Sequence, residues 1–353
     1  MQQKPNIRHL SPDELRQYFQ QAGEKPFRAA QVHSWLWQKH ARCFSDMTDL
    51  SRELRATLER DFRLPAIKSD LIQHSSDGTV KSRFILHDGS LIEGVLIPSG
   101  ERTTACISSQ AGCSLACKFC ATGYMGHLRN LDFDEIYDEA ALINQQSLDT
   151  HQHKLTNIVF MGMGEPLLNY SQVLRAIERI TAPDGLAMSP RRITVSTAGI
   201  AKMIRKLGED LVRFNLALSL HAATDAKRSA IMPVNDTNGL KSLIDALNYF
   251  YKLTGNEITF EYILLNDFND SGRDGEELIR LYRQVPVKVV NVIQYNPIAQ
   301  AGFLASGEDK TRQFMDLLLS RQVNARLRRS RGKDIDAACG QLANLSSESK
   351  PVR

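Results

Sequence analysis

Apolar side chains recur at helical spacing through the first seventy residues of the chain, which is the pattern of helices that bury one face. They include Val32, Leu36, Leu50, Leu54 and Leu58. Ser11 and Glu14 stand in a capping-box arrangement where the first helix would begin, and Gly23 would end it. The pattern predicts a small domain of three or four helices over residues 1–72.

Between residues 73 and 99 the pattern changes to short β-branched and apolar runs. Two Asp-Gly pairs, Asp77-Gly78 and Asp88-Gly89, separate these runs. Because Asp-Gly favours tight hairpin turns, we expect a β-hairpin that links the helical domain to the rest of the chain.

Residues 100–335 alternate between strand-like and helix-like patterns. The strand-like runs are "NIVFMGMG", "RITVSTAG", "FNLALSLHA", "EITFEYILL" and "VKVVNVIQYNP", and the helical ones include "FDEIYDEAALINQQS" and "GLKSLIDALNYFYKLTG". Such alternation predicts an α/β fold with a parallel sheet, here a partial (β/α)6 barrel. Barrels place their chemistry at the C-terminal ends of the strands, which here carry "GMGEP", "STAG", "SLH" and "YNP". Residues 336–353 would form a C-terminal segment, with the polar end "SSESKPVR" expected to be disordered.

Composition indicates a globular protein in a reducing compartment. The 353 residues are 42% hydrophobic, enough for a sizeable core. No run approaches the roughly 18 apolar residues of a membrane span, and the N-terminus lacks the apolar core of a secretory signal. We therefore expect a cytoplasmic protein that does not associate with membranes, and bunched cysteines that bind metal in preference to forming disulfides.

Charge is concentrated near the C-terminus although the net charge is only +4. The stretch from residue 321 to 333 holds six basic side chains and no acidic one: Arg321, Arg326, Arg328, Arg329, Arg331 and Lys333. Such a run can contact phosphates, or it can be a solvated face of the last strand and its loop. The helical domain leaves the same choice open, between an RNA-docking module and a packing cap.

Four of the six cysteines lie between Cys106 and Cys120. Within this group Cys113, Cys117 and Cys120 have C-x3-C-x2-C spacing, which supplies three thiolates from one loop and no nearby fourth ligand. A 4Fe-4S cluster bound in this way keeps one iron open for another ligand. The alternative is a structural zinc site completed by Cys106 or by a distant histidine.

The C-x3-C-x2-C loop followed by "KFCATGYMG" and a strand ending in "FMGMGEPLLN" resembles the radical S-adenosylmethionine enzymes. When "ITVSTAGI", "NLALSLHA", "YNP" and "RGKDIDAACGQLA" are added in this order, the set is similar to the RlmN/Cfr family of RNA adenine methyltransferases and covers nearly the whole chain. The resemblance implies a 4Fe-4S cluster that chelates S-adenosylmethionine and cleaves it to a carbon radical. Two S-adenosylmethionine molecules would be consumed per turnover.

The resemblance also implies catalytic roles for the two remaining cysteines of the barrel, Cys106 and Cys339. Cys339 would accept a methyl group from one S-adenosylmethionine, and the radical derived from the second would activate that methyl for addition to the adenine ring. Glu93 would remove the ring proton. Cys106 would then release the product by forming a transient disulfide with Cys339. Read without the resemblance, both cysteines could equally be inert buried thiols, and Glu93 a surface residue of a strand.

Cofactor-binding residues follow from the same motifs. Gly164 and Glu165 of "GMGEP" would receive the methionine part of the cofactor, although the glycines could simply form a strand-to-helix turn. The adenosine part would be lined by Ser196, Ser219, Leu220, His221 and Asn296. Cys43 lies outside every motif, and we assign it no function.

The family resemblance implies methylation at carbon 2 of an adenosine in 23S rRNA, at the peptidyl transferase centre, and of an adenosine next to the tRNA anticodon. A Cfr-like enzyme that methylates carbon 8 is the nearest alternative, and Pro166 favours the RlmN-like branch. A zinc-stabilised RNA-binding protein without catalytic activity is the alternative from another class. For the enzyme we expect a flavodoxin or ferredoxin as electron donor, and a monomer.

Overall fold

A ten-stranded sheet forms the centre of the molecule in the computed structural model, which describes residues 4–344. In sheet order its strands are β1 (Lys68–His74), β2 (Val80–Ile85), β3 (Leu91–Ser99), β4 (Arg102–Cys106), β7 (Asn157–Phe160), β8 (Ile193–Thr197), β9 (Asn215–Ser219), β10 (Ile258–Leu264), β11 (Val287–Gln294) and β12 (Ala325–Arg328). The strands from β4 to β12 are parallel, whereas β1 to β4 are antiparallel. Parallel pairing brings the C-terminal ends of seven strands to one edge.

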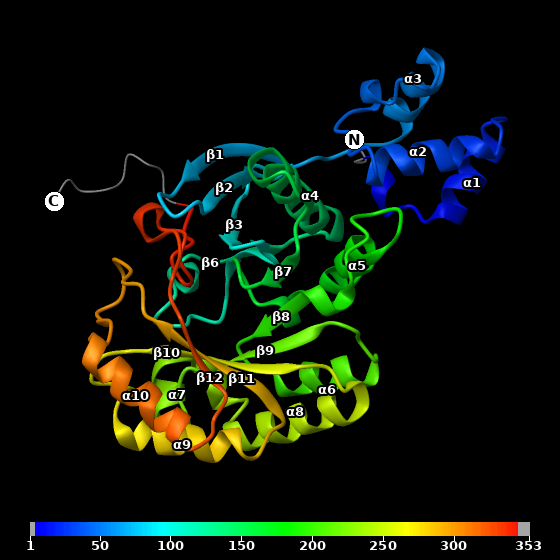
Figure 1. The fold of residues 1–353 in the computed structure, drawn as a ribbon. Coiled ribbons are helices and arrows are strands. Elements are labelled where there is room, and N and C mark those ends of the chain that lie inside the picture. Colours follow the sequence, from blue (N-terminus) through cyan, green and yellow to red (C-terminus); the bar gives the residue numbers. More distant parts are fainter. Residues whose placement is uncertain (1–3, 345–353) are drawn as a thin grey trace.

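Helices cover the outer face of the parallel strands (Figure 1). They are α4 (Phe133–His151), α5 (Tyr170–Thr181), α6 (Ala201–Glu209), α7 (Asp225–Ile231), α8 (Leu240–Thr254), α9 (Gly272–Tyr282) and α10 (Glu308–Ser320). In α5 the side chains of Val173, Ala176, Ile177 and Ile180 are buried, at the three- and four-residue spacing that places them on one face. The predicted α/β fold with a partial barrel is confirmed.

The N-terminal helices α1 (Pro12–Gln21), α2 (Phe27–Trp37) and α3 (Arg52–Asp61) form a separate group beside α4 and α5 (Figure 1). The predicted capping box of Ser11 and Glu14 is present. Two buried contacts tie this group to α4: Arg8 forms an ion pair with Asp138 at 2.7 Å, and the Tyr137 hydroxyl donates to the Trp37 carbonyl oxygen at 2.7 Å. The helical group is therefore fixed to the barrel by polar bonds in a buried junction.

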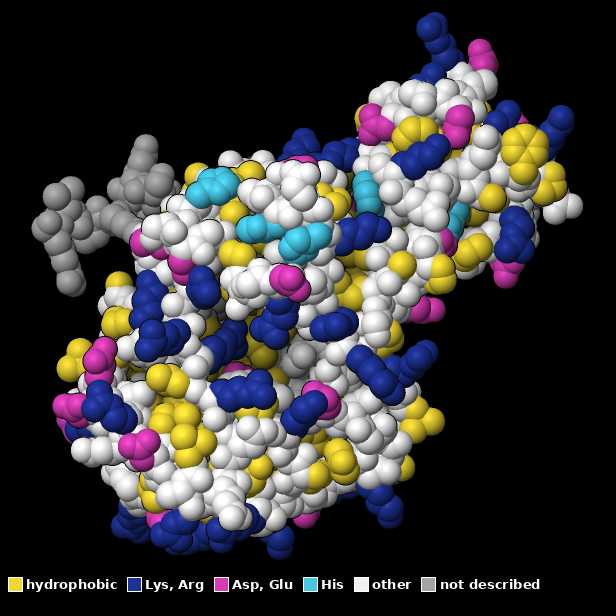
Figure 2. Space-filling view, viewed as in Figure 1, with side chains coloured by type: hydrophobic (Ala, Val, Ile, Leu, Met, Phe, Trp, Pro, Cys, Tyr) yellow, Lys and Arg dark blue, Asp and Glu magenta, His cyan; other side chains and the backbone are white. Residues whose placement is uncertain are grey.

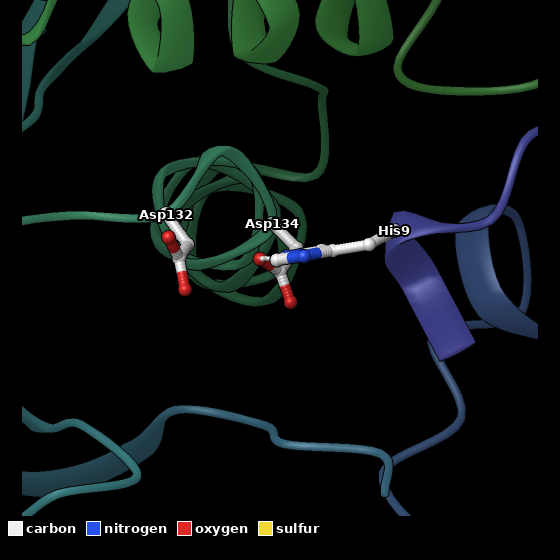
Figure 3. A group of neighbouring side chains, drawn as sticks. All are labelled: His9, Asp132 and Asp134. Atoms are coloured by element: carbon white, nitrogen blue, oxygen red, sulfur yellow. Dashed lines mark hydrogen bonds and ion pairs between the residues drawn. The ribbon is translucent and has the colours of Figure 1, made fainter. Parts of the chain in front are cut away.

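A histidine and two aspartates lie at the same junction (Figure 3). Their ligand atoms are within 4.8 Å of one another, close enough to bind a cation. However, the Asp134 carboxylate already contacts His9 at 3.1 Å and accepts from Asn6 at 2.8 Å, while Asp132 is the N-cap residue of α4 and its backbone amide donates to the Glu135 carboxylate at 2.9 Å. Burial would raise the pKa of Asp134, but His9, Arg8 and Asn6 together hold that pKa below its usual value. The bonds at the junction between the N-terminal helical group and α4 therefore explain this group of side chains.

The segment expected to be a separate hairpin is part of the main sheet. β1 begins at Lys68, five residues before the expected start, and the two Asp-Gly turns join three antiparallel strands instead of two. β3 then pairs with β4, whose other edge pairs with β7. Residues 68–99 therefore extend the ten-stranded sheet beyond β4, the first parallel strand of the barrel.

The C-terminal segment crosses from β12 back to the antiparallel strands (Figure 1). Asp77 accepts from the Gly332 amide at 3.0 Å, and the Asn344 side chain donates to the Leu91 carbonyl oxygen at 2.9 Å. Between these contacts the Gly340 carbonyl oxygen accepts from the Ala121 amide at 2.7 Å. These bonds hold the loop that contains Cys339 against the cysteine-rich loop. The sequence "SSESKPVR" lies outside the described residues.

Candidate active site

One cavity at the C-terminal ends of the parallel strands collects most of the side chains expected to act. From the sequence-based set it is lined by Cys106, Cys113, Cys117, Cys120, Gly164, Glu165, Ser196, Ser219, His221 and Cys339. These residues come from segments up to 233 positions apart (339 − 106) and meet only through the fold. The cavity walls described for residues 4–344 do not include Glu93, Leu220 or Asn296.

Cys113 ends β5 (Gln110–Cys113), and Cys117 and Cys120 sit on the turn that leads from it to β6 (Gly126–Asn130). The turn is tightly wound: a side chain at Gly123 would put its Cβ 2.8 Å from the Cys117 carbonyl oxygen. All three sulfurs are free thiols. Burial raises the pKa of Cys113 to about 11, and it also raises those of Cys117 and Cys120, so a bound cation would be needed to hold all three as thiolates.

The donor set of this loop fits an iron-sulfur cluster that keeps one iron open, because it supplies three thiols and no fourth ligand. A structural zinc site would need a fourth protein ligand from elsewhere. The ligand atoms of His9, Asp132 and Asp134 are the group that lies within 4.8 Å of one another among the described residues.

The "GMGEP" turn after β7 packs directly on β5. Gly164 has a positive φ of +94°, and a Cβ there would lie 2.5 Å from the Cβ of Gln110. Glu165 is buried, and its carboxylate accepts from the Ala198 amide at 2.7 Å and the Leu167 amide at 3.1 Å. Burial nevertheless raises its pKa. Glu165 thus joins the ends of β7 and β8, and its carboxylate borders the cavity beside the cysteine loop.

The next two strands contribute hydroxyls and an imidazole. The Oγ atoms of Ser196 and Ser219 are 3.2 Å apart across β8 and β9. His221 accepts from the Ile263 amide through Nδ1 at 3.2 Å, so its proton lies on Nε2. Burial, aided by the Arg228 charge, lowers the pKa of His221 to about 3, which keeps the imidazole neutral. The wall formed by these strands therefore presents uncharged donors and acceptors.

A buried arginine ties these strand ends together. Arg228 is fully buried, and it donates to the carbonyl oxygens of Ala198, Leu220 and Ser219 and to the side chain of Asn235. Burial lowers its pKa to about 10. Leu220 therefore contributes to the site through its backbone carbonyl oxygen, which accepts from Arg228 behind the cavity wall.

We expect Arg228→Met to destabilise the protein by about 3 kcal/mol, because several buried carbonyl oxygens would lose their donor. Urea unfolding of preparations with equal cluster content measures this. Lys202→Met, at an exposed position of α6, is the matched control and should change the stability by less than about 0.5 kcal/mol. Equal stability of the two variants would contradict the role of Arg228.

Cys106 and Cys339 lie outside the cysteine loop and line the same cavity from segments that are far apart in the sequence. Cys106 ends β4 and is buried, whereas Cys339 is exposed where it borders the cavity, and both are free thiols. Burial and the neighbouring Cys339 raise the pKa of Cys106 to about 12, and Arg328 opposes the shift. Although residue 339 is partly open to solvent, its thiol borders the cavity, where loss of hydration raises its pKa, and Arg328 again opposes the shift. One guanidinium therefore acts on both thiols.

Glu93 and Asn296 lie next to the segment that contains Cys339. The Glu93 carboxylate is 3.5 Å from the Lys81 ammonium and accepts from the Ala343 amide at 3.0 Å. Asn296 donates to Ser330 at 2.8 Å and to the Cys339 carbonyl oxygen at 3.5 Å, while its own Oδ1 has no hydrogen-bond partner. Both side chains support this loop from behind the cavity wall.

Two cavity residues were not singled out from the sequence. Glu261 belongs to the β10 run "EITFEYILL", and Arg328 was considered only as a member of the basic run. For Glu261 the available signal was a charged residue within an otherwise apolar strand, which is costly to bury without a partner. Arg328 gave no such signal, because its strand also contains Arg326 and is followed by Arg329. Alternation along β12 turns Arg328 toward the cavity while its neighbours Leu327 and Arg329 are exposed.

Basic side chains surround the mouth of the site. On the face seen in Figure 2, Lys and Arg side chains gather along a hollow between the part of the molecule that holds β1 to β4 and the part that holds α8 to α10. Arg326, Arg329, Arg331 and Lys333 are all exposed. Their positive field favours a polyanion at this surface. None of the helices in residues 4–344 combines the length and the apolar character that crossing a bilayer requires.

Comparisons with known proteins agree with this geometry. Residues 5–64 match the family model described as the ribosomal RNA large subunit methyltransferase N-terminal domain, and residues 107–282 match the radical SAM superfamily. A protein of Cytophaga hutchinsonii named "Probable dual-specificity RNA methyltransferase RlmN" is 54% identical, over 96% of this chain and 93% of its own. A protein of the same name from Christiangramia forsetii is 49% identical, over 98% and 97%. The crystal structure of a radical SAM methyltransferase from Sphaerobacter thermophilus superposes with a TM-score of 0.90 at 37% identity, covering 96% of this chain and 99% of that one.

Proposed function

The chain belongs to the RlmN family of radical S-adenosylmethionine RNA methyltransferases, and from this we propose that it methylates carbon 2 of an adenosine in 23S rRNA and of an adenosine next to the tRNA anticodon. The observation that supports the mechanism most directly is that Cys106 and Cys339 line the cavity that the three loop cysteines also line. A binding protein stabilised by zinc would have no use for the Cys339 thiol at this place.

When bound, a 4Fe-4S cluster with S-adenosylmethionine supplies an electrophilic methyl group and, on one-electron reduction, a carbon radical. Cys113, Cys117 and Cys120 would hold the cluster, and the Gly164 turn would leave room beside it for the methionine part of the cofactor. Ser196, Ser219 and His221 would bind the adenosine part through neutral hydrogen bonds. Asn296, whose Oδ1 lacks a partner, would add an acceptor from beneath the Cys339 loop.

The two free thiols would act in sequence. Cys339 would lose its proton, and its sulfur would bond to the methyl carbon as the bond between that carbon and the sulfonium sulfur of S-adenosylmethionine breaks, so that Cys339 becomes a thioether. That carbon would give up a hydrogen atom to the carbon radical that the cofactor supplies and would bond to carbon 2 of adenine, which tethers the base to Cys339. The adduct would lose one electron, for which a bound cluster can serve as acceptor, and the proton of carbon 2, for which Glu93 would have to leave Lys81 and the Ala343 amide behind the cavity wall. The Cys106 thiolate would then attack the Cys339 sulfur. The disulfide forms as the sulfur–carbon bond breaks, and the departing carbon takes up a proton to become the methyl group of the released base.

The RNA would bind over the basic surface, with its target adenine unstacked into the cavity. Unstacking costs a few kcal/mol unless the base already lies in a loop, and phosphate contacts offset that cost. The exposed arginines between Arg326 and Arg331 stand next to the Cys339 segment, so they can hold the backbone close to the reactive sulfur. A flavodoxin or ferredoxin would supply electrons, and we propose that a monomer in the cytoplasm is the active form.

Analysis of the methylated nucleoside tests the proposal. Anaerobically reconstituted protein is incubated with S-adenosylmethionine labelled at the methyl group, a reductant and a ribosomal RNA fragment, and the digested RNA is analysed by mass spectrometry. We expect labelled 2-methyladenosine. Labelled 8-methyladenosine would assign carbon 8 as the target, and the absence of any methyladenosine from protein with a full cluster would refute the function.

A further inference from the structure

A carboxylate and a guanidinium face the cavity side by side and have incomplete hydrogen bonding. The Glu261 side chain is only 4% exposed, and its Oε2 lies 3.6 Å from Nη1 of Arg328. Oε1 accepts from Asn291 at 2.7 Å and from Thr259 at 3.1 Å, whereas Oε2 has no hydrogen-bond partner. A buried carboxylate oxygen without a donor is costly, so this atom is poised for a ligand.

The guanidinium also retains binding capacity. Its hydrogen-bond partner within the described part of the chain is the sulfur of Met161, at 3.7 Å, and a thioether is a weak acceptor. Five N–H groups on a planar frame leave several donors for a ligand. The cavity wall thus offers an acceptor, Glu261 Oε2, and the donors of Arg328, which are joined to each other by an ion pair at 3.6 Å that a ligand could bridge. Asn291 and Thr259 fix the orientation of the carboxylate.

This pair lies where the reacting base must be. Glu261 and Arg328 line the same cavity as Cys106 and Cys339. The charge of Arg328 acts on both thiols, and that of Glu261 acts on Cys339. A base bonded to the methyl carbon of Cys339 would lie in the cavity that these side chains line.

We propose that Glu261 and Arg328 bind and select the target base, and this inference rests on the proposed function. Glu261 Oε2 accepts from the 6-amino group of adenine, and Arg328 donates to N1. The order of acceptor and donor on the protein complements the donor and acceptor on that edge of adenine. Guanine and uracil present a carbonyl oxygen and an N–H in these places, so both contacts would be repulsive.

We assign N1 to Arg328 because carbon 2 is bonded to N1. Arg328 lines the cavity together with Cys106 and Cys339, so a base held through N1 has carbon 2 in the same cavity as both thiols. The other ligand chemistry that this pair could serve is the ribose of the cofactor, which has hydroxyl groups but no ring nitrogen for Arg328 to bind.

Base analogues at the target position test the contacts, first with the unaltered chain. Purine riboside lacks the 6-amino group, and 1-deazaadenosine lacks N1. We expect single-turnover methylation of each to be about 10- to 100-fold slower than that of adenosine, since each leaves a buried polar group without its partner. Equal rates for adenosine and purine riboside, in protein that methylates adenosine, would overturn the inference and leave the proposed function intact.

Variants then link each contact to its residue. In Glu261→Gln, Asn291 and Thr259 should keep the amide oxygen on the Oε1 side, which turns the NH₂ group toward the base. Two donors would then meet, so the preference for adenosine over purine riboside should fall to within about threefold. Arg328→Met should remove the preference over 1-deazaadenosine in the same way. Arg273→Met, at an exposed position of α9 away from the cavity, should change neither ratio.

A readout without RNA separates the two candidate ligands. Incubation with S-adenosylmethionine alone should give S-methylcysteine at residue 339 in both variants, detected by peptide mass spectrometry. Loss of this modification in variants that retain the cluster would show that the pair binds the cofactor and would overturn the inference. Failure of the unaltered chain to methylate adenosine would refute the proposed function and the inference with it.

Discussion

Replacement of Cys339 by alanine is expected to abolish adenosine methylation, a loss of at least about a thousandfold, because no other residue can carry the methyl group to the base. Cys106 lines the same cavity, but it is buried and burial raises its pKa to about 12, so its thiol is a poor substitute acceptor. Labelled methyl transfer to RNA, measured by mass spectrometry, checks the result. Cys43→Ala is the matched control, because that exposed thiol lies in the helical domain and bonds Ser45 and Asp46.

Cys106→Ala should fail at a different point. The methyl carbon of Cys339 can still bond to the base, but no thiol remains to attack the tether. We expect a covalent complex of protein and RNA that migrates as one band on a denaturing gel. Retained methylation in Cys339→Ala, or release of free product by Cys106→Ala, would each contradict the assigned sequence of events.

The fold could be predicted to a large extent because its signals are local. Apolar runs of four to eight residues separated by amphipathic stretches specify parallel strands and covering helices without knowledge of tertiary contacts. The capping box of Ser11 and Glu14 could be predicted for the same reason, since both residues lie within one helical turn. The start of β1 at Lys68 was missed, because its pairing with Ile85 is a tertiary contact and its exposed side chains have no apolar pattern.

The site was harder to derive, since its parts meet only after folding. Motif spacing located the cysteine loop and the glycine turn, and the cavity brings them together with Cys106 and Cys339. The places of Glu93, behind the cavity wall and bonded to Lys81, and of Arg328, within it, depend on which face of each strand closes on the barrel. Alternation of side chains along a strand defines two faces of that strand. Which face points into the barrel depends on how the whole sheet assembles.

Replacement of Cys117 by alanine is expected to reduce the iron content from roughly four atoms per chain to less than one and to eliminate methylation. Two thiolates cannot hold a cluster with an open iron, and burial of the remaining sulfurs raises their pKa, so they would revert to neutral thiols. Iron and zinc analysis together with the visible absorbance of anaerobically reconstituted protein measures the effect. Cys106→Ala is the discriminating control: its sulfur faces the same cavity but is not assigned to the cluster, so iron should remain.

The same pair of variants separates the cluster from the zinc alternative. A structural zinc completed by Cys106 would lose its metal in Cys106→Ala and Cys117→Ala alike, and the unaltered protein would be colourless with about one zinc per chain. An iron-sulfur cluster bound by the loop alone loses its metal only in Cys117→Ala. Because the loop supplies three thiols and leaves one position of a cluster open, we expect the second pattern. Metal loss in both variants would instead place Cys106 among the ligands and leave Cys339 without a partner for product release.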